Sequence, residues 1–431
     1  MAKKAFFSLA LLWFGSILGR GSTFIIYFIL ARELGADLFG VFSSAMATIM
    51  IFTLIAGFGI AQVWLQLFGA EGWRAVRWVR PSLNFVAASL GAIIIFILLI
   101  IALQADDVLT NKLLLLLFLF LCGYIGVQLV ASKLQLEERY NNLTILQFLP
   151  NLVRLLLLIL IIYVFRDELN LDIVGAVYAS VGMVFSIISF LELKKMSKGD
   201  FDLKGHTKSP DFPSAIEKEK SLRIKDIFAR AWPFGFAGIF AFVYIQSDII
   251  MVRYISGNSE AAFYNVAFTV LSAIMTIPII LFSKYLIPKY HRWSNQNKSL
   301  LISTHKKGNL FMILTGILIA LGLLLVSPFL IPLLFGNEYD SSIGLLKILA
   351  FSVPLTFISY SYGAILLTDE HVRLKVKLMG SVALFNIVLN IFTIPRYGPQ
   401  GAAVSTLLSN FLLMVLYRYY TIKKVFSNIG A

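Results

Sequence analysis

The chain has little of what builds a soluble or secreted domain. Its 431 residues include one cysteine, Cys122, and only 14% are charged. A single cysteine excludes an internal disulfide framework, and soluble domains average about 25% charged residues. Hydrophobic residues make up 59% of the chain, and its mean hydropathy is +0.84. This composition excludes an ordinary soluble fold and indicates an integral membrane protein.

Sequence motifs of enzymes and metal sites are also missing. The chain has no Walker loop and no G-x-G-x-x-G, H-E-x-x-H or C-x-x-C pattern. Its four histidines fall in predicted loops without ligand spacing. We therefore expect no metal, no cofactor and no enzymatic activity. The net charge of +14 does not indicate a nucleic acid partner, because the basic residues are distributed as a membrane topology requires.

Apolar stretches long enough to cross a bilayer recur along the whole chain. A helix needs about 20 residues to span the hydrocarbon core. The segments that meet this length are 6–30, 39–64, 82–104, 112–132, 144–165, 173–193, 230–254, 261–286, 309–334, 343–367, 374–394 and 400–421. The sequence therefore predicts an all-α polytopic membrane protein with about twelve transmembrane helices.

Basic residues predict the orientation of these helices. With both termini in the cytoplasm, 29 of the 37 Lys and Arg residues fall in cytoplasmic segments and six in outer segments. This asymmetry agrees with the positive-inside rule. The N-terminus resembles a signal peptide, but its apolar part is too long and no small-residue cleavage site follows it, so we expect a retained first helix.

The longest polar stretch divides the chain near its middle. Residues 196–228 contain glycine, proline, serine and charges of both signs, which is typical of a linker. The sequence thus predicts an N-terminal six-helix bundle over 1–195, a cytoplasmic linker over 196–228 and a C-terminal six-helix bundle over 229–431.

The remaining two of the 37 Lys and Arg residues, Arg20 and Arg154, lie deep inside predicted spans. Arginine at the bilayer centre costs about 2.5–3.5 kcal/mol on insertion scales. Neither residue is close enough to a helix end to extend easily to the membrane surface. We expect both to face a watery interior and to bind an anionic group there.

Other polar residues lie at helical spacing within the spans. The amides among them are Gln128, Gln147, Asn151, Asn386 and Asn390. Such amides either bind a substrate or hold neighbouring helices together. Asp248 is the one carboxylate that the sequence places deep within a predicted span. It could form an ion pair, bind a coupling ion or lie at the membrane interface.

Four short segments resemble those of one membrane protein family. Residues 31–40 read A-R-E-L-G-A-D-L-F-G, and residues 334–339 read L-F-G-N-E-Y. S-D-I-I-M at 247–251 precedes F-Y-N-V-A at 263–267, and Asn386 to Asn390 precede I-P-R-Y-G-P-Q-G-A-A at 394–403. These segments are similar to those of the polysaccharide and O-antigen flippases in the MATE-like multidrug/oligosaccharidyl-lipid/polysaccharide exporter superfamily.

The resemblance implies two facing six-helix bundles and export of an isoprenoid-diphosphate-linked oligosaccharide. Export would run from the cytoplasmic to the outer leaflet of a bacterial inner membrane, and twelve spans favour O-antigen, capsule or exopolysaccharide units. Arg20 and Arg154 would receive the diphosphate, while the five amides bind sugar hydroxyls or support the arginines. Expected partners are membrane lipids, H⁺ or Na⁺ as coupling ion, and polysaccharide polymerases or glycosyltransferases.

Two other functions fit the same composition. A drug or cation antiporter of the same superfamily would be expected to carry acidic residues in its cavity, whereas the central charges here are cationic. A membrane glycosyltransferase or polymerase acting on lipid-linked sugars would need an acid, a base or a metal at the membrane face, and usually a large acceptor loop. The sequence offers neither feature.

Overall fold

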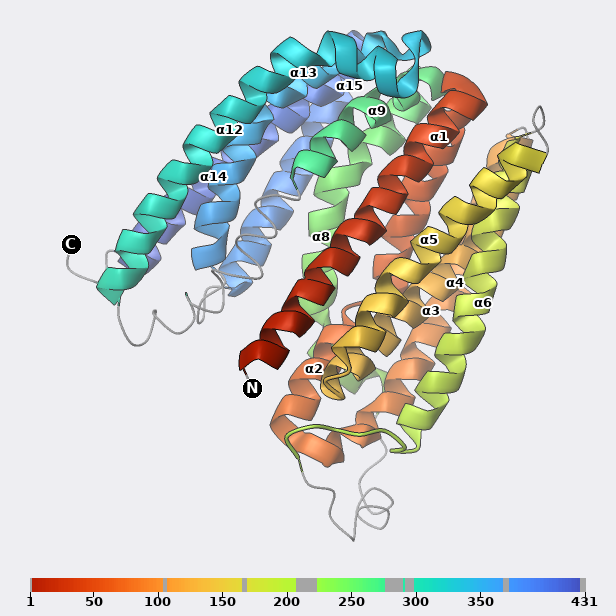
Figure 1. The fold of residues 1–431 in the computed structure, drawn as a ribbon, viewed down its shortest axis with the longest axis vertical. Coiled ribbons are helices and arrows are strands. Elements are labelled where there is room, and N and C mark those ends of the chain that lie inside the picture. The colour runs from red at the N-terminus through yellow and green to blue at the C-terminus, as the bar shows by residue number, and fades with distance from the viewer. Residues whose placement is uncertain are drawn as a thin grey trace. The chain divides into compact units, whose positions relative to one another are not determined.

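A computed structural model of the chain describes residues 2–103, 107–164, 169–206, 223–275, 290, 298–366 and 372–426. Within these residues the chain forms helices joined by short turns and contains no β-strand (Figure 1). The predicted all-α class is confirmed. Its physical basis is that helices satisfy every backbone polar group internally, as a hydrocarbon environment requires.

The N-terminal half is built from long helices. They are α1 (Ala2–Gly57), α2 (Ile60–Glu71), the 3₁₀ turn η1 (Gly72–Ala75), α3 (Val76–Leu103), α4 (Val108–Leu136), α5 (Tyr140–Val164) and α6 (Leu171–Ser197). The sequence leaves a loop between its first two spans, but α1 runs through it with one break at Gly35 (φ 71°, ψ 171°). Glycine tolerates this positive φ without a steric cost, so the helix restarts at once.

The C-terminal half follows the same pattern with more bends. It contains α8 (Ile224–Ser256), α9 (Asn258–Ile274), α12 (Lys298–Phe335), η3 (Asn337–Tyr339), α13 (Ser341–Ala350), α14 (Ser352–Ile365), α15 (Val372–Thr421) and the π-helical turn η5 (Ile422–Phe426). The predicted span 343–367 is divided between α13 and α14, which meet at a 40° bend. Helix α15 covers the last two predicted spans and breaks at Gly398 (φ 56°).

The number of membrane crossings is not fixed by helix length alone. The described residues contain seven helical stretches long and apolar enough to span a membrane, or eight if α13 and α14 form one bent span. The stretches over α1–α3 and α15 contain glycine breaks and are longer than one crossing needs. The count of twelve stays a prediction, and residues 276–286 of its eighth span lie outside the described residues.

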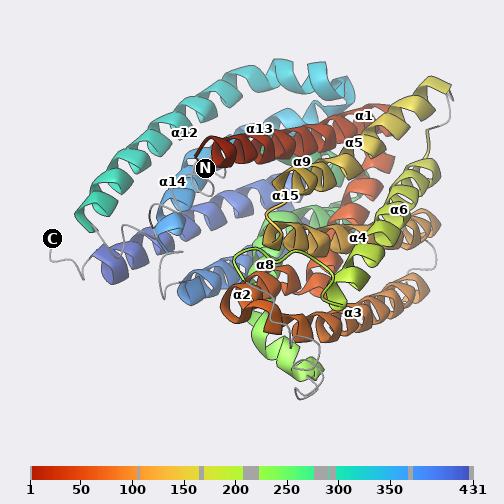
Figure 2. The ribbon, with the colours of Figure 1, turned by 60° about the horizontal axis from the view of Figure 1, so that its bottom comes forward.

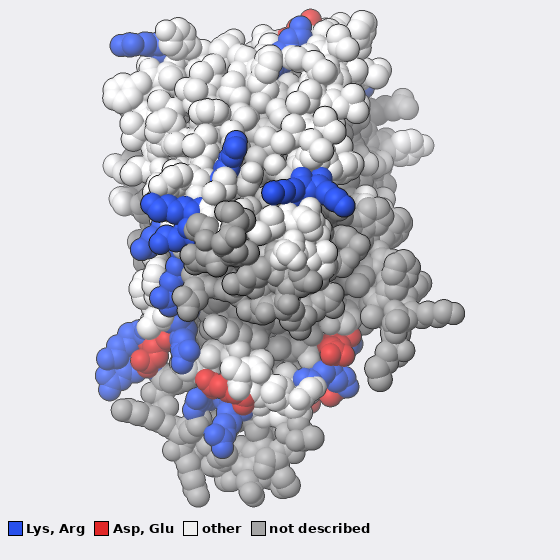
Figure 3. Space-filling view, turned by 90° about the vertical axis from the view of Figure 1, so that its left-hand side faces the viewer, with Lys and Arg blue, Asp and Glu red and all other residues white. Residues whose placement is uncertain are grey.

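Apolar side chains cover much of the protein surface. Along α12 they recur at helical spacing on one exposed face: Leu314, Leu318, Leu321, Leu325, Phe329 and Leu333. Exposure of such large apolar side chains to water is costly, whereas acyl chains accommodate them. Wide areas without charged side chains are visible on the face drawn in Figure 3. The chain is a multi-span integral membrane protein.

The structure divides into two compact units. Unit 1 comprises residues 1–27 and 45–239, and unit 2 comprises residues 28–44 and 240–431. The predicted bundle boundaries at 195 and 229 stay a prediction, because residues 207–222 of the predicted linker lie outside the described residues. The described start of that linker packs on unit 1, where Phe201 contacts the rings of Phe68 and Trp73.

Glycines allow helices α4 and α6 of unit 1 to approach each other closely. Figures 1 and 2 both draw α4 and α6 side by side. A Cβ atom at Gly182 would lie 2.5 Å from the Cα of Phe120, and one at Gly123 would lie 2.4 Å from the carbonyl oxygen of Gly182. The two backbones therefore touch, as small residues permit in membrane helices.

Unit 2 brings together segments that the sequence separates widely. The Ala36 N–H, freed by the break at Gly35, donates to Oε1 of Glu338 at 2.8 Å. The Tyr339 hydroxyl donates to the Ala31 carbonyl oxygen at 2.8 Å. These bonds fasten residues 28–44 to the turn after α12. Two of the four family-like segments, 31–40 and 334–339, are thus in direct contact.

Candidate functional site

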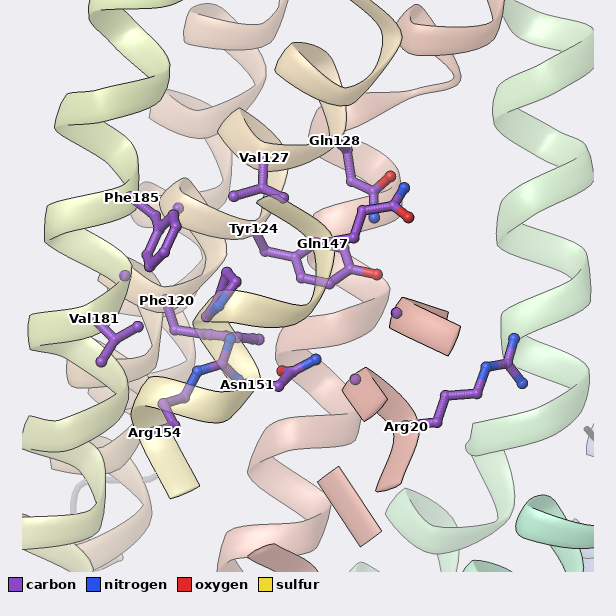
Figure 4. Close-up of a pocket in the computed structure, with 15 residues that line it drawn as sticks. Arg20, Phe120, Tyr124, Val127, Gln128, Gln147, Asn151, Arg154, Val181 and Phe185 are labelled. Atoms are coloured by element: carbon purple, nitrogen blue, oxygen red, sulfur yellow. The ribbon is translucent and has the colours of Figure 1, made fainter. Parts of the chain in front are cut away.

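Unit 1 contains a cavity of about 260 Å³ between α1, α4, α5 and α6 (Figure 4). Its lining includes one predicted arginine from α1, one from α5 and three of the predicted amides: Arg20, Arg154, Gln128, Gln147 and Asn151. Their spacing on α5 follows one helical face. The structure therefore brings five of the seven predicted substrate-binding residues to one cavity.

Arg154 is the buried cation of this cavity. Its side chain lies on α5 at 8% exposure. The guanidinium carbon is 4.8 Å from the ring centroid of Phe120 on α4 and 5.0 Å from that of Tyr178 on α6. No carboxylate pairs with Arg154 in the described part of the chain, and its Nε finds no hydrogen-bond acceptor there. A buried guanidinium held by rings keeps its net charge.

Small residues let α1 approach the polar face of α5. A Cβ atom at Gly15 would lie 2.2 Å from Cγ2 of Thr144, and one at Gly19 would lie 3.6 Å from Nδ2 of Asn151. The Thr144 hydroxyl bonds to the Tyr140 carbonyl oxygen of its own helix, which satisfies it locally. The α1 glycines thus form one wall of the cavity without filling it.

Arg20 differs from Arg154 in its surroundings. It is exposed, whereas Arg154 is buried. Figure 4 shows its side chain extending away from the other labelled residues. Both arginines line the same cavity, but their guanidinium groups do not converge on one point in this conformation.

The amides lie beyond Arg154 along the cavity. Figure 4 shows the carboxamides of Gln128 and Gln147 pointing toward one another from α4 and α5. Tyr124 lines the cavity on the same helix face as Gln128. Asn151 stands on α5 between Gln147 and Arg154. The cavity therefore presents one cationic end and one end with amide donors and acceptors.

Asn386 and Asn390 do not line this cavity. They lie on α15 in unit 2, where both are fully buried. Asn390 Nδ2 donates to Asp248 Oδ1 at 2.5 Å and contacts Asn386 Oδ1 at 3.2 Å. In unit 2 both asparagines contribute to the surroundings of a buried carboxylate.

Asp248 is the centre of this second site. Its carboxylate, 1% exposed, also accepts hydrogen bonds from the hydroxyls of Tyr264 at 2.7 Å and Thr406 at 2.5 Å. No Lys or Arg of the described residues pairs with it. The Asn390 Oδ1 atom lacks a donor among the described groups. Carboxylate, amide and hydroxyl oxygens are the ligands that hard cations prefer.

Several residues of these sites are absent from the sequence-based set. Phe120 lies one helical turn before Tyr124 on the polar face of α4, so helical spacing could have identified it. Tyr264 lies inside one of the family-like segments, 263–267. Nothing in the sequence indicates that Tyr178 of α6 and Thr406 of α15 contact Arg154 and Asp248, since only the packing of separate helices brings them there.

The chain matches relatives over most of its length. Residues 6–292 match the family described as polysaccharide biosynthesis protein. The chain is 24% identical to the probable low-salt glycan biosynthesis flippase Agl15 of Haloferax volcanii, in an alignment that covers 97% of this chain and 85% of that protein.

Solved structures share the fold. The lipid II flippase MurJ in an inward closed conformation matches with a TM-score of 0.69 and 16% identity, covering 96% of this chain and 88% of the other. An inward-facing multidrug resistance MATE family transporter of the MOP superfamily matches with a TM-score of 0.70 and 13% identity, covering 98% and 99%. The architecture is therefore MATE-like. With its family match spanning more than half of the chain, this protein belongs to the polysaccharide biosynthesis protein family.

Proposed function

We propose that the protein moves an isoprenoid-diphosphate-linked oligosaccharide, an O-antigen, capsule or exopolysaccharide unit, from the cytoplasmic to the outer leaflet. Family membership and the similarity to a probable glycan biosynthesis flippase support this proposal. The observation that carries it is Arg154, a buried cation that lines a cavity and pairs with no carboxylate of the described residues. Such a cation inside a membrane protein indicates a functional site, and an anionic group is the ligand that suits it.

The chemistry of the cavity suits the head of this substrate. Guanidinium groups bind phosphate oxygens through paired, charge-assisted hydrogen bonds. Gln128, Gln147 and Asn151 offer donors and acceptors to sugar hydroxyls. The volume of about 260 Å³ lies just below the range of small-molecule pockets, about 300–1,000 Å³. We propose that the cavity receives the diphosphate end of the substrate, while the lipid tail stays in the bilayer.

Transport would proceed by alternating access of the cavity to the two sides of the membrane. Asp248 is the proposed ion-coupling residue, and H⁺ or Na⁺ is the proposed ion. Its oxygen-rich surroundings in unit 2 support this role. Asn386 and Asn390 belong to this ion site in the proposal, instead of contacting sugar.

The test is transport by protein reconstituted in liposomes with a fluorescent isoprenoid-diphosphate sugar. Arg154→Ala removes the buried charge, and we expect flipping to slow by on the order of 100-fold. Arg20→Ala should have a smaller effect, because the Arg20 side chain is exposed and extends away from the other labelled cavity residues. Arg32→Ala is the matched control, since Arg32 also stacks on a ring, Phe28, but does not line the cavity. Full transport by Arg154→Ala would refute the proposal.

A drug or cation antiporter is the second candidate. The buried carboxylate of Asp248 favours it, as does the fold shared with a multidrug resistance transporter. The two candidate functions predict different effects of mutations at Asp248 and Arg154 on the transport of each cargo. Under this alternative, Asp248→Asn would abolish efflux of a cationic dye and Arg154→Ala would not. A flippase would show no dye efflux at all.

We also propose that the protein has no enzymatic activity. It would act in a bacterial inner membrane together with the enzymes of polysaccharide synthesis. A glycosyltransferase or polymerase would convert purified lipid-linked sugars in detergent, whereas a flippase would return them unchanged. Both termini are proposed to be cytoplasmic, which fusion of a reporter to either end would test. Crosslinking in cells would identify polymerase or glycosyltransferase partners.

A further inference from the structure

We propose that Phe120 and Tyr178 are positioning residues that hold Arg154 as an uncompensated cation for the diphosphate of the substrate. This inference rests on the proposed function, because it names the residues that prepare Arg154 for its ligand. The two rings come from different helices, α4 and α6, and both lie against the same guanidinium. We call them the aromatic corner.

The geometry of the aromatic corner leaves one side of the guanidinium open. The ring centroids of Phe120 and Tyr178 are 5.5 Å apart, with an angle of 69° between the ring planes. A sandwich around the guanidinium would separate the centroids by nearly the sum of their distances to it, 4.8 Å and 5.0 Å. The rings therefore meet on one side of Arg154, and the cavity that Arg154 lines can lie on the other.

Rings suit this task better than a carboxylate. An aromatic face attracts a cation through its quadrupole and carries no net charge. A carboxylate would bind the guanidinium in a bidentate manner, neutralise it and occupy the N–H groups that a phosphate requires. Among the described residues no carboxylate pairs with Arg154. The neutral hydroxyl of Tyr178 accepts a hydrogen bond from the guanidinium, and the Nε of Arg154 has no acceptor. The aromatic corner thus fixes the guanidinium and leaves its charge available.

The glycine contact between α4 and α6 builds the aromatic corner. The Cα of Phe120 lies in the contact itself, opposite Gly182, and Tyr178 lies four residues, about one helical turn, before Gly182. Because the backbones touch there, the rings of Phe120 and Tyr178 can reach each other. The same close approach that stabilises the helix pair therefore positions the cation.

The test measures ligand affinity of the purified protein in nanodiscs. The probe is farnesyl diphosphate, and farnesyl monophosphate and farnesol serve as comparison ligands. Removal of one ring by Phe120→Leu or Tyr178→Leu should weaken diphosphate binding by about 3- to 20-fold, the range expected for a desolvated cation–π contact. Tyr178→Phe keeps the ring and removes only the hydroxyl that accepts a hydrogen bond from Arg154, so it should weaken diphosphate binding less than Tyr178→Leu does. Farnesol binding should not change in any variant.

Phe190→Leu is the matched control. Phe190 lies on the same helix, α6, but its side chain is exposed and does not line the cavity. Its replacement removes an aromatic ring from α6 without changing the surroundings of Arg154. We expect diphosphate affinity to stay within about twofold, since no charge contact is lost.

A double-mutant cycle separates positioning from a general structural role. In an Arg154→Ala background, Tyr178→Leu should change diphosphate affinity by less than about twofold, because the ring then has no cation to hold. An equal loss in both backgrounds, or no loss in either, would overturn the inference. Normal binding by Arg154→Ala alone would instead remove the proposed role of Arg154, so the two failures are distinguishable.

Discussion

The cavity of unit 1 and the Asp248 cluster of unit 2 each bury one charge without an ion-pair partner among the described residues. They treat that charge in opposite ways. Arg154 contacts two aromatic rings and has an Nε without an acceptor. Asp248 accepts three hydrogen bonds, from Tyr264, Thr406 and Asn390. The cation donates a hydrogen bond to the Tyr178 hydroxyl and keeps one N–H without an acceptor, whereas the anion accepts a hydrogen bond from each of three donors.

This difference indicates what each region can bind. A guanidinium with an unused donor beside a cavity can bind a large anion, because no carboxylate of the described residues competes for it. A buried carboxylate surrounded by hydroxyl and amide groups suits a proton or a small hard cation. In the proposed cycle, unit 1 therefore binds the substrate and unit 2 binds the ion.

The largest effect on stability is expected from Asp248→Ala. This change leaves the three donors around the carboxylate unpaired in a buried site, and each unpaired donor costs about 1–3 kcal/mol. We expect a melting temperature far below that of the unmodified protein, measured in detergent with equal protein loading. An unchanged melting temperature would mean that these donors find other partners, and the comparison between the two regions would fail.

The next largest effect on stability is expected from a substitution at the glycine contact between α4 and α6, which also lines the cavity. Gly182→Ala forces α6 away from Phe120, and such overpacking costs about 1–3 kcal/mol. Gly91→Ala on α3 is the control, because nothing lies within 4 Å of its added Cβ and alanine favours helix. We expect the melting temperature to fall for Gly182→Ala and not for Gly91→Ala. Equal behaviour of the two variants would contradict a close α4–α6 contact.

A single donor of the anionic cluster should contribute less. Thr406→Val keeps the shape of the side chain and removes one hydrogen bond to Asp248, which in membrane proteins is worth about 0.6–1.7 kcal/mol. Ser381→Ala on the same helix is the control, since the exposed Ser381 bonds only to its own helix. A small loss of stability is expected for Thr406→Val, with a change in the ion dependence of transport. Identical melting and ion dependence of both variants would argue against the cluster.

The smallest effect on stability is expected at the residue most important for transport. Arg154→Met retains an apolar chain against Phe120 and Tyr178 and leaves no carboxylate unpaired among the described residues. We expect the free energy of unfolding to change by less than about 1 kcal/mol, while transport is lost. Circular dichroism melting of the same sample used for transport would check this. A large loss of stability would mean that Arg154 is mainly structural.

Helical spacing predicted part of the candidate site. The spacing of Gln147, Asn151 and Arg154 on one helix face is local, so it survives in the structure as a continuous lining of the cavity. Asn386 and Asn390 show the same kind of spacing, but they surround Asp248 instead. Periodicity tells which residues share a face, and it does not tell which other helix that face meets.

The family-like segments illustrate the same limit. Their order along the chain favoured the correct family, which the match over residues 6–292 confirms. The sequence did not indicate that the segment containing Ala36 and the one containing Glu338 are joined by a hydrogen bond. These residues are 302 positions apart, and such a contact depends on the folding of everything between them.

The sequence alone determined that this chain is a helical membrane protein, because apolar length and the scarcity of charge are properties of local composition. It also determined that two cations lie within the spans. Only the tertiary structure decided which partners surround each buried charge. Helix packing selected rings for Arg154 and hydrogen-bond donors for Asp248, and no local pattern in the chain records which helices touch.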